Sequence, residues 1–413
     1  MRKIVTIITI FMLVALIAAA ALFLRSGNFG ATPQPTAPAA ELTPSPTPSP
    51  TPTPTPQPTE TPEPEQTSFV FSFVGDCTLS SSQHAKNSEF AYERIIGTDF
   101  GYPFAKTVQY FADDYMSLAN MEGTFTDAEA SSGGTFTFKS GAEFANIFAE
   151  GGIDFVTLAN NHSGDYLAAG REDTRTALDA AGVVYAGDNE TCLYQREGGP
   201  LVGVYAKLYP TLSDVTAGIA ALKEQGAEII IAALHWGLEG KYRPTADQQA
   251  VGHAAIDAGA HIVYGSHPHV LQRTEEYDGG CILYSLGNWS FGGNTHPRDR
   301  DSAILRVTVE KGEDGVYRFG TLEKIPCALS GSEGYNDYQP VPYEAGSVAY
   351  ERTMSKLDGS FTGPDLTIDY SAFHKNETAG EPTAERDDEE AAAPEVGEST
   401  PNFSENEQVF SEN

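Results

Sequence analysis

The chain has 413 residues and a formal net charge of −32, with 57 Asp and Glu against 25 Lys and Arg. This excess of acid excludes nucleic acid as a partner, because a phosphate backbone is bound through a basic face. The four cysteines (Cys77, Cys192, Cys281 and Cys327) are too few for a disulfide scaffold, and no CxxC motif indicates a cysteine-based zinc site. Four cysteines allow three pairings, and their spacing does not choose among them.

The N-terminus predicts a membrane anchor. Residues 4–24 form an almost unbroken apolar run, long enough to cross a hydrocarbon layer of about 30 Å, and Arg2 and Lys3 precede it. We therefore expect residues 1–25 to be a single transmembrane helix, with the rest of the chain on the extracytoplasmic side. A cleaved signal peptide is the alternative, although its apolar region is usually shorter, about 7–15 residues.

Composition divides the rest of the chain. Residues 26–67 are dominated by Pro and Thr, which predicts a disordered, extended linker that lifts a domain off the membrane. A folded domain is expected over 68–345. The segment 346–413 is expected to be a weakly ordered to disordered tail, since its residues 376–413 carry twelve Asp or Glu against a single basic residue, Arg386.

Within the folded domain, short apolar runs alternate with helical patterns. The runs that predict strands are 69–76, 115–122, 153–162, 183–187, 201–206, 228–237, 261–269, 281–288 and 303–309. Helical patterns at 143–152, 171–182 and 246–259 each end in Gly, a common helix terminator. Strands separated by helices of this length predict an α/β sheet fold. A late antiparallel hairpin is expected over 303–325, around a turn at 312–315.

Polar residues with chemical potential follow six of these apolar runs. They are Asp76, then Asn120 and Glu122, then Asn160, Asn161 and His162, then His235, then His267 and His269, and finally Asn288. Ends of strands in an α/β sheet deliver loops to a common crevice, so we expect one convergent site. Imidazole with carboxylate favours one or two divalent ions such as Zn, Mn or Fe over an all-oxygen calcium or magnesium site.

The motifs themselves carry a resemblance to a known family. The segments GDCTL (75–79), ANMEG (119–123), LANNHSGDY (158–166), LHWGLE (234–239), GAHIVYGSHPHVLQ (259–272) and YSLGNWSF (284–291) resemble the CapA family. These poly-γ-glutamate capsule biosynthesis proteins are related to calcineurin-like metallophosphatases. The resemblance implies a four-layer α/β/β/α sandwich of the metallophosphatase type.

The same resemblance implies roles for individual residues. The metal ligands would be Asp76, Glu122, Asn161, His235, His267 and His269, and His162 would be the catalytic residue that protonates the leaving group. The sequence departs from the wider pattern at three positions. Thr78 stands where a histidine is usual, Glu122 where an aspartate is usual, and Ser163 where an aspartate follows the Asn-His pair, so a mononuclear or weakly dinuclear site is implied.

Other residues have plainer interpretations. Asn120, Asn160 and Asn288 are expected to tie loops together behind the ligands. Glu239 would orient a ligand histidine or simply face solvent. Asp76 would serve as a turn residue if it is not a ligand, and Asn161 and His162 would cap a helix beginning near residue 168.

From these observations we expect a membrane-anchored, extracytoplasmic protein of capsule or poly-γ-glutamate biosynthesis or export. Its expected partners are an anionic extracellular polymer and membrane synthase or export subunits. The expected activity is metal-dependent hydrolysis of a phosphoester or a γ-glutamyl amide. A non-catalytic subunit that grips the polymer for a synthase or exporter is the main alternative. A spacer-mounted adhesin would explain the anchor but not the six polar motifs.

Overall fold

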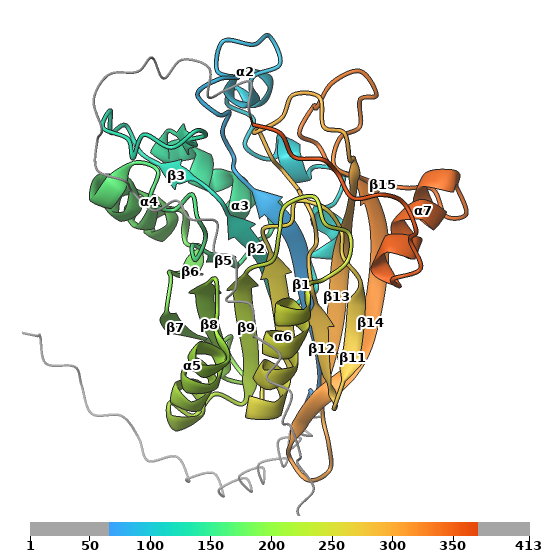
Figure 1. The fold of residues 1–413 in the computed structure, drawn as a ribbon. Helices are drawn as coiled ribbons and strands as arrows, with labels where there is room; N and C mark the ends of the chain where they lie inside the picture. The colour runs from blue at the N-terminus through green and yellow to red at the C-terminus, as the bar shows by residue number, and fades with distance from the viewer. Residues whose placement is uncertain (1–65, 371–413) are drawn as a thin grey trace, which may run out of the picture. The chain divides into compact units, whose positions relative to one another are not determined.

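The computed structural model describes residues 66–370, and Figure 1 shows their arrangement. The predicted anchor (1–25), the linker up to residue 65 and the tail from residue 371 lie outside the described residues. Within residues 66–370, none of the helices combines the length and the apolar character needed to cross a membrane.

The first sheet has seven strands in the order β15-β14-β13-β1-β2-β5-β6. Their bounds are β1 Ser68–Cys77, β2 Met116–Met121, β5 Phe155–Thr157, β6 Val184–Ala186, β13 Asp301–Lys311, β14 Tyr317–Ala328 and β15 Val341–Pro342. The four strands β1, β2, β5 and β6 are mutually parallel, whereas β13 and β14 form the expected antiparallel hairpin beside β1.

The second sheet has six strands in the order β11-β12-β10-β9-β8-β7. Their bounds are β7 Glu190–Tyr194, β8 Val202–Leu208, β9 Ile229–His235, β10 Ile262–Ser266, β11 Thr274–Tyr277 and β12 Gly280–Leu283. The strands β8, β9, β10 and β12 are parallel, and the two edge strands are antiparallel to their neighbours. A separate two-stranded sheet pairs β3 (Thr124–Phe125) with β4 (Lys139–Ser140).

Helices cover the outer faces of both sheets. They are α2 Tyr92–Ile96, α3 Asn146–Gly151, α4 Leu167–Ala181, α5 Leu212–Glu224, α6 Ala246–Ala258 and α7 Val348–Leu357, with short 3-10 turns at Tyr102–Phe104, Val108–Tyr110 and Ala142–Ala145. The sequence patterns predicted α3, α4 and α6 but not α5. A capping box between Thr211 and Asp214 starts α5, and the same device between Thr245 and Gln248 starts α6.

Three buried clusters define four layers. One cluster lies between the two sheets and joins residues such as Phe71 of β1 to Ile231 of β9. A second packs the other face of the first sheet against α3 and α4, and a third packs the second sheet against α5 and α6. The expected α/β class is therefore confirmed, with the sheets face to face and helices outside (Figure 1).

The expected end of the folded domain at residue 345 is wrong, because the ordered chain continues beyond it. Helix α7 buries Leu357 against the first sheet, and its Lys356 side chain is only 2% exposed. Lys356 forms ion pairs with Asp299 and Asp301 at 2.7 and 2.8 Å. Composition missed this helix because one buried ion-pair network, rather than an apolar stripe, holds much of it in place.

A close backbone approach joins the first sheet to the loop that follows the second. The amide of Asp76 donates to the carbonyl of Gly287 at 2.8 Å, and the amide of Trp289 donates to the carbonyl of Asp76 at 2.8 Å. A Cβ atom on Gly75 would lie 2.0 Å from the carbonyl oxygen of Gly287, so only glycine permits this contact. The junction places the end of β1 beside the loops of the second sheet.

Candidate metal centre

The six predicted ligands lie together at the carboxyl edges of the two sheets. Asp76 is near the end of β1, Glu122 directly follows β2, and Asn161 lies in the loop after β5. From the second sheet, His235 ends β9, and His267 and His269 follow β10. Parallel strands deliver their carboxyl ends to one edge, which explains why residues so distant in sequence meet here.

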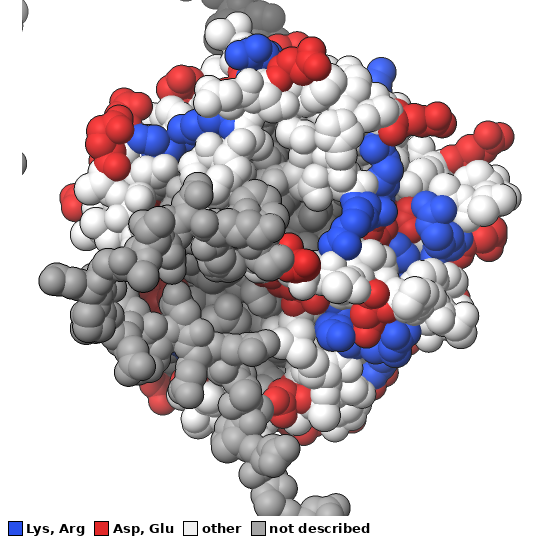
Figure 2. Space-filling model, turned by 45° about the horizontal axis from the view of Figure 1, so that its top comes forward, with Lys and Arg blue, Asp and Glu red and all other residues white. Residues whose placement is uncertain are grey.

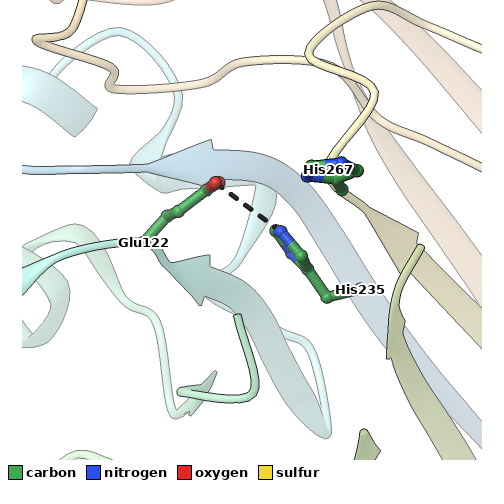
Figure 3. A group of neighbouring side chains, drawn as sticks. All are labelled: Glu122, His235 and His267. Atoms are coloured by element: carbon green, nitrogen blue, oxygen red, sulfur yellow. Dashed lines mark ion pairs between the residues drawn. The ribbon is translucent and has the colours of Figure 1, made fainter. Parts of the chain in front are cut away.

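One buried group joins Glu122, His235 and His267, whose ligand atoms all lie within 4.8 Å of one another. Figure 3 shows the three side chains converging from three different elements. The Nε2 atom of His235 is 3.6 Å from Oε1 of Glu122 and 2.7 Å from Oδ1 of Asn161. Two imidazoles, a carboxylate and an amide oxygen form a donor set that suits a borderline divalent ion.

A second group shares Glu122 with the first. Here Asp76, Glu122 and His269 bring their ligand atoms within 4.8 Å of one another. The Nδ1 atom of His269 is 3.1 Å from Oδ2 of Asp76, and its Nε2 atom is 3.7 Å from Oε1 of Glu122. Glu122 is therefore the one side chain placed to bridge two positions.

Two atoms of these groups are buried without any hydrogen-bond partner. They are Oε1 of Glu122 and Nδ1 of His267. A buried polar atom left unpaired costs about 1–3 kcal/mol, so a native fold retains one only for a reason. A divalent cation would take both atoms as ligands, and the residues present therefore fit a metal.

Burial and mutual charge shift the protonation of the cluster. Burial lowers the pKa of His235 well below its usual range and that of His267 to about 4, and the neighbouring His269 adds to both effects. Burial alone would also lower the pKa of His269, but the Glu122 and Asp76 carboxylates outweigh it and raise the value to about 10. Burial raises the pKa of Glu122 well above its usual range; His269 opposes this and Asp76 reinforces it. Two neutral imidazoles thus stand ready as ligands, while His269 acts as the counter-ion of the carboxylates.

His162 lies at the mouth of this cluster rather than within it. Its Nδ1 atom is 3.0 Å from Oδ2 of Asp165, and its ring packs edge-on against Phe138. The Asp165 contact leaves Nε2 available for proton transfer. The alternative in which Asn161 and His162 cap a helix is wrong, because α4 begins at Leu167 after Tyr166, without a side-chain cap.

Asp165 was missed by the sequence motifs. The motif comparison looked for an aspartate directly after the Asn-His pair and found Ser163 there. The chain instead makes a short turn, in which the Asp165 amide donates to the carbonyl of His162 at 3.2 Å and the carboxylate folds back onto the ring. The i, i+3 spacing of His162 and Asp165 was the available signal.

The three predicted supporting asparagines lie directly behind the ligands. The Asn120 amide donates to Oδ1 of Asp76 at 2.9 Å and to Oε2 of Glu122 at 3.1 Å. Asn160 donates to the Asn120 side-chain oxygen at 3.1 Å, and Asn288 contacts Nδ1 of His269 at 2.9 Å. Ser266, which the sequence did not single out, contacts Nδ1 of His235 at 2.8 Å. These contacts aim the ligand atoms at the common centre.

Glu239 and Thr78 differ from their simplest interpretations. Glu239 groups with His267 and His269, with ligand atoms within 4.8 Å of one another, so it is placed as a potential ligand. Its carboxylate also accepts a hydrogen bond from the hydroxyl of Tyr370. Thr78 is buried, and its hydroxyl donates to the Ser80 carbonyl at 2.9 Å and accepts from the Gly292 amide at 2.7 Å. Thr78 thus holds two loops together.

The turn that carries both ring ligands is strained. His267 and His269 have φ values of 98° and 55°, in the left-handed region that side chains avoid. Just before them, a Cβ atom on Gly265 would lie 2.2 Å from the Tyr284 carbonyl, which makes glycine necessary there. Strained backbone of this kind persists where the surroundings over-determine it and is frequent at functional sites.

A cavity of about 830 Å³ opens beside the cluster. Asn161, His162, Glu239 and His269 line one part of it. Further along, its walls come from Phe136, Arg298 and the segment 366–370, which the sequence placed in the tail. This volume is in the upper part of the range of small-molecule sites and leaves room for a substrate larger than a single amino acid.

Comparison with known proteins identifies the family. A model of the bacterial capsule synthesis protein PGA_cap matches residues 70–197 and 189–292, together more than half of the chain. The capsule biosynthesis protein CapA of Bacillus anthracis is 30% identical over 57% of this chain and 62% of its own length, slightly under two thirds. The PGA biosynthesis protein CapA of Bacillus subtilis is 26% identical over 61% of this chain and 70% of its own length.

Solved structures resemble this one more distantly. The NAD nucleotidase of Haemophilus influenzae has a TM-score of 0.35 and 11% identity, over 71% of this chain and 63% of its own. The family match covers β1 to the loop after β12, which are the elements that carry every candidate ligand. The chain is therefore a member of the bacterial capsule synthesis protein PGA_cap family.

Proposed function

We propose that this protein is a metal-dependent hydrolase that acts on an anionic capsule polymer of the poly-γ-glutamate type. The observation that carries the proposal is the pair of unpartnered buried atoms, Oε1 of Glu122 and Nδ1 of His267, at the centre of a carboxylate–imidazole cluster. The names of the relatives from the two Bacillus species support the polymer class, since both concern capsule or PGA biosynthesis.

The ligand geometry supports two positions of unequal strength. Glu122, Asn161, His235 and His267 would hold one ion, and Asp76, Glu122 and His269 a second. The second position has fewer donors, because Thr78 stands where a further imidazole would be expected. When bound, such ions supply Lewis-acid activation of a scissile carbonyl or phosphoryl group.

The chain's own residues would orient the substrate and move a proton. His162 lines the cavity beside the ligands, and Asp165 fixes its ring through Nδ1. Nε2 of His162 would then donate a proton to the leaving nitrogen or oxygen as the scissile bond breaks. The buried walls around Phe138 exclude bulk water from this proton transfer.

Location at the membrane is part of the same proposal. The apolar run 4–24 and the Pro/Thr-rich linker support a tethered domain outside the membrane that works beside synthase or export subunits. Protease added to intact cells should release the domain by cutting the linker. Full protection of the domain in unbroken cells would contradict this placement.

The decisive experiment measures metal and hydrolysis on the same preparation. The purified full chain is analysed for bound metal and then assayed against γ-glutamyl oligomers and phosphoesters, with His162→Ala as the comparison. We expect metal in both proteins and hydrolysis only in the wild type. Absence of metal from the wild type would overturn the proposal. Metal and polymer binding without hydrolysis would make the protein a polymer-binding subunit instead.

A further inference from the structure

The cavity beside the metal cluster is lined by acidic residues and by one fixed cation. Asp165, Glu239, Asp299 and Asp369 line it, and Arg298 is the single Lys or Arg among its described lining residues. In a chain with a net charge of −32, an anionic substrate would meet repulsion almost everywhere. The position of the one guanidinium in the cavity therefore matters for how such a substrate is held.

The backbone around Arg298 is held on its C-terminal side. The next residue, Asp299, pairs with the buried Lys356 at 2.7 Å. Two residues further, Asp301 pairs with Arg352 at 2.6 Å and with Lys356 at 2.8 Å. Both partners come from α7, so this helix fixes the segment that follows Arg298.

Arg298 itself is exposed, and it forms no hydrogen bond or ion pair with any residue from 66 to 370. Its charge nevertheless reaches the metal side of the cavity. Burial and the Glu239 carboxylate raise the pKa of Tyr370, and the charge of Arg298 opposes them. Because Tyr370 bonds to Glu239, Arg298 and the ligand group lie on a common path along the cavity wall.

We propose that Arg298 is the carboxylate-binding residue of the substrate site and holds an acidic group of the polymer while the scissile bond lies at the metal cluster. This inference rests on the proposed function, which supplies the anionic polymer. Five N–H donors in a planar fork match a carboxylate in two parallel hydrogen bonds, which lysine does not reproduce. The guanidinium would thereby select substrates by charge and set their register in the cavity.

The plainer interpretation is a solvated surface arginine. Figure 2 shows that basic side chains gather on the side of the molecule where Figure 1 places α7 and β14, so exposed cations are not rare there. Arg298 differs from a general surface charge in lining the cavity and in being followed by an anchored segment. Arg94 is a matched control, since it is exposed in α2, forms no side-chain contact within residues 66–370 and lies outside the cavity.

The test measures binding of a labelled γ-glutamyl pentamer with free α-carboxylates, and of the same pentamer with α-carboxamides, to the metal-loaded full chain at about 0.15 M salt, where distant charges are screened. Arg298→Gln should weaken binding of the acid pentamer about tenfold or more and leave the amide pentamer unchanged. Arg298→Lys should recover only part of the loss. Arg94→Gln, with the same change in net charge, should alter neither affinity by more than about twofold.

The outcomes separate this inference from the proposed function. Equal loss in the Arg298 and Arg94 variants, or none in either, overturns the role of Arg298 while wild-type metal content and acid binding still uphold the function. A wild type that binds both pentamers equally overturns the anionic substrate and the inference together. Metal content and melting temperature, measured on every variant, should match the wild type, because Arg298 is not a ligand and supports no packing contact.

Discussion

Oδ2 of Asp165 lies 3.0 Å from Nδ1 of His162, three residues earlier in the chain, and the same oxygen accepts a hydrogen bond from the amide of Phe138 at 2.7 Å. The carboxylate thus joins the catalytic candidate to the wall of the cavity that packs on its ring. Its place in the loop after β5 gives His162 a defined orientation before any substrate arrives.

This relationship predicts the effect of Asp165→Asn. The amide removes the anionic partner of the His162 ring, so hydrolysis should fall by about 10- to 100-fold while metal content is unchanged. In the double variant with His162→Ala, the loss should equal that of His162→Ala alone, because both residues act on one proton transfer. Turnover measured for the four proteins decides this, with Ser163→Ala as the near-neutral control.

Unequal metal positions predict unequal losses. His235→Ala should abolish metal retention, since His235 belongs to the group with more donors. Asp76→Ala should leave about one ion bound, because Asp76 serves only the smaller group. Elemental analysis at equal added metal distinguishes the two. Full retention by His235→Ala would mean that the metal does not bind at this cluster.

Metal binding should release protons and strengthen as the pH rises. The pKa of His269 is raised to about 10, so its ring is protonated in the metal-free protein near neutrality, and an ion at Asp76, Glu122 and His269 must displace that proton. Between pH 6 and 9 the apparent affinity of this position should increase by about tenfold per pH unit. Calorimetry in buffers of different ionisation enthalpy measures the released proton directly.

The same shift affects the metal-free protein's stability. The folded pKa of His269 lies above its ordinary value of 6.5, so its contribution is fully present below that pH and is lost as the pH rises through about 10. Metal-free protein should therefore show a falling melting temperature over this window. A His269→Gln variant should lose most of that pH dependence, and an unchanged curve would contradict the ion-pair assignment.

Gly75→Ala should destabilise the fold strongly. The new Cβ atom would lie 2.0 Å from the Gly287 carbonyl oxygen, which belongs to backbone and has little freedom to move. We expect a loss of about 3 kcal/mol or more in the free energy of unfolding. Gly334→Ala, where a Cβ meets nothing within 4 Å, should be nearly neutral in the same urea titration.

Truncation should locate the true end of the domain. A chain ending at residue 345 loses α7 and leaves Asp301 buried without Arg352 and Lys356, which should cost about 3–5 kcal/mol. A chain ending at residue 379 keeps these pairs and should melt with the full-length protein. Equal melting temperatures for both truncations would show that α7 is dispensable.

Much of the fold and of the candidate site was predictable from the sequence, for identifiable reasons. Apolar runs of strand length marked β1, β2, β8, β9 and β10, because buried strands need unbroken hydrophobic residues. Polar residues directly after those runs had to reach one sheet edge, so Glu122, His235 and His267 were predicted to meet, and they do. Helix α5 escaped prediction, although its capping box at Thr211 and Asp214 was present in the sequence.

Only the tertiary structure decided how these residues are completed. The contact of Asp165 with His162 depends on a turn that folds the chain back, and spacing alone did not rank it above other acidic residues. Tyr370 reaches Glu239 across 131 residues, and Lys356 reaches Asp299 across 57. Such partners carry no local pattern, because the free energy that selects them comes from burying charge against charge once the layers have packed.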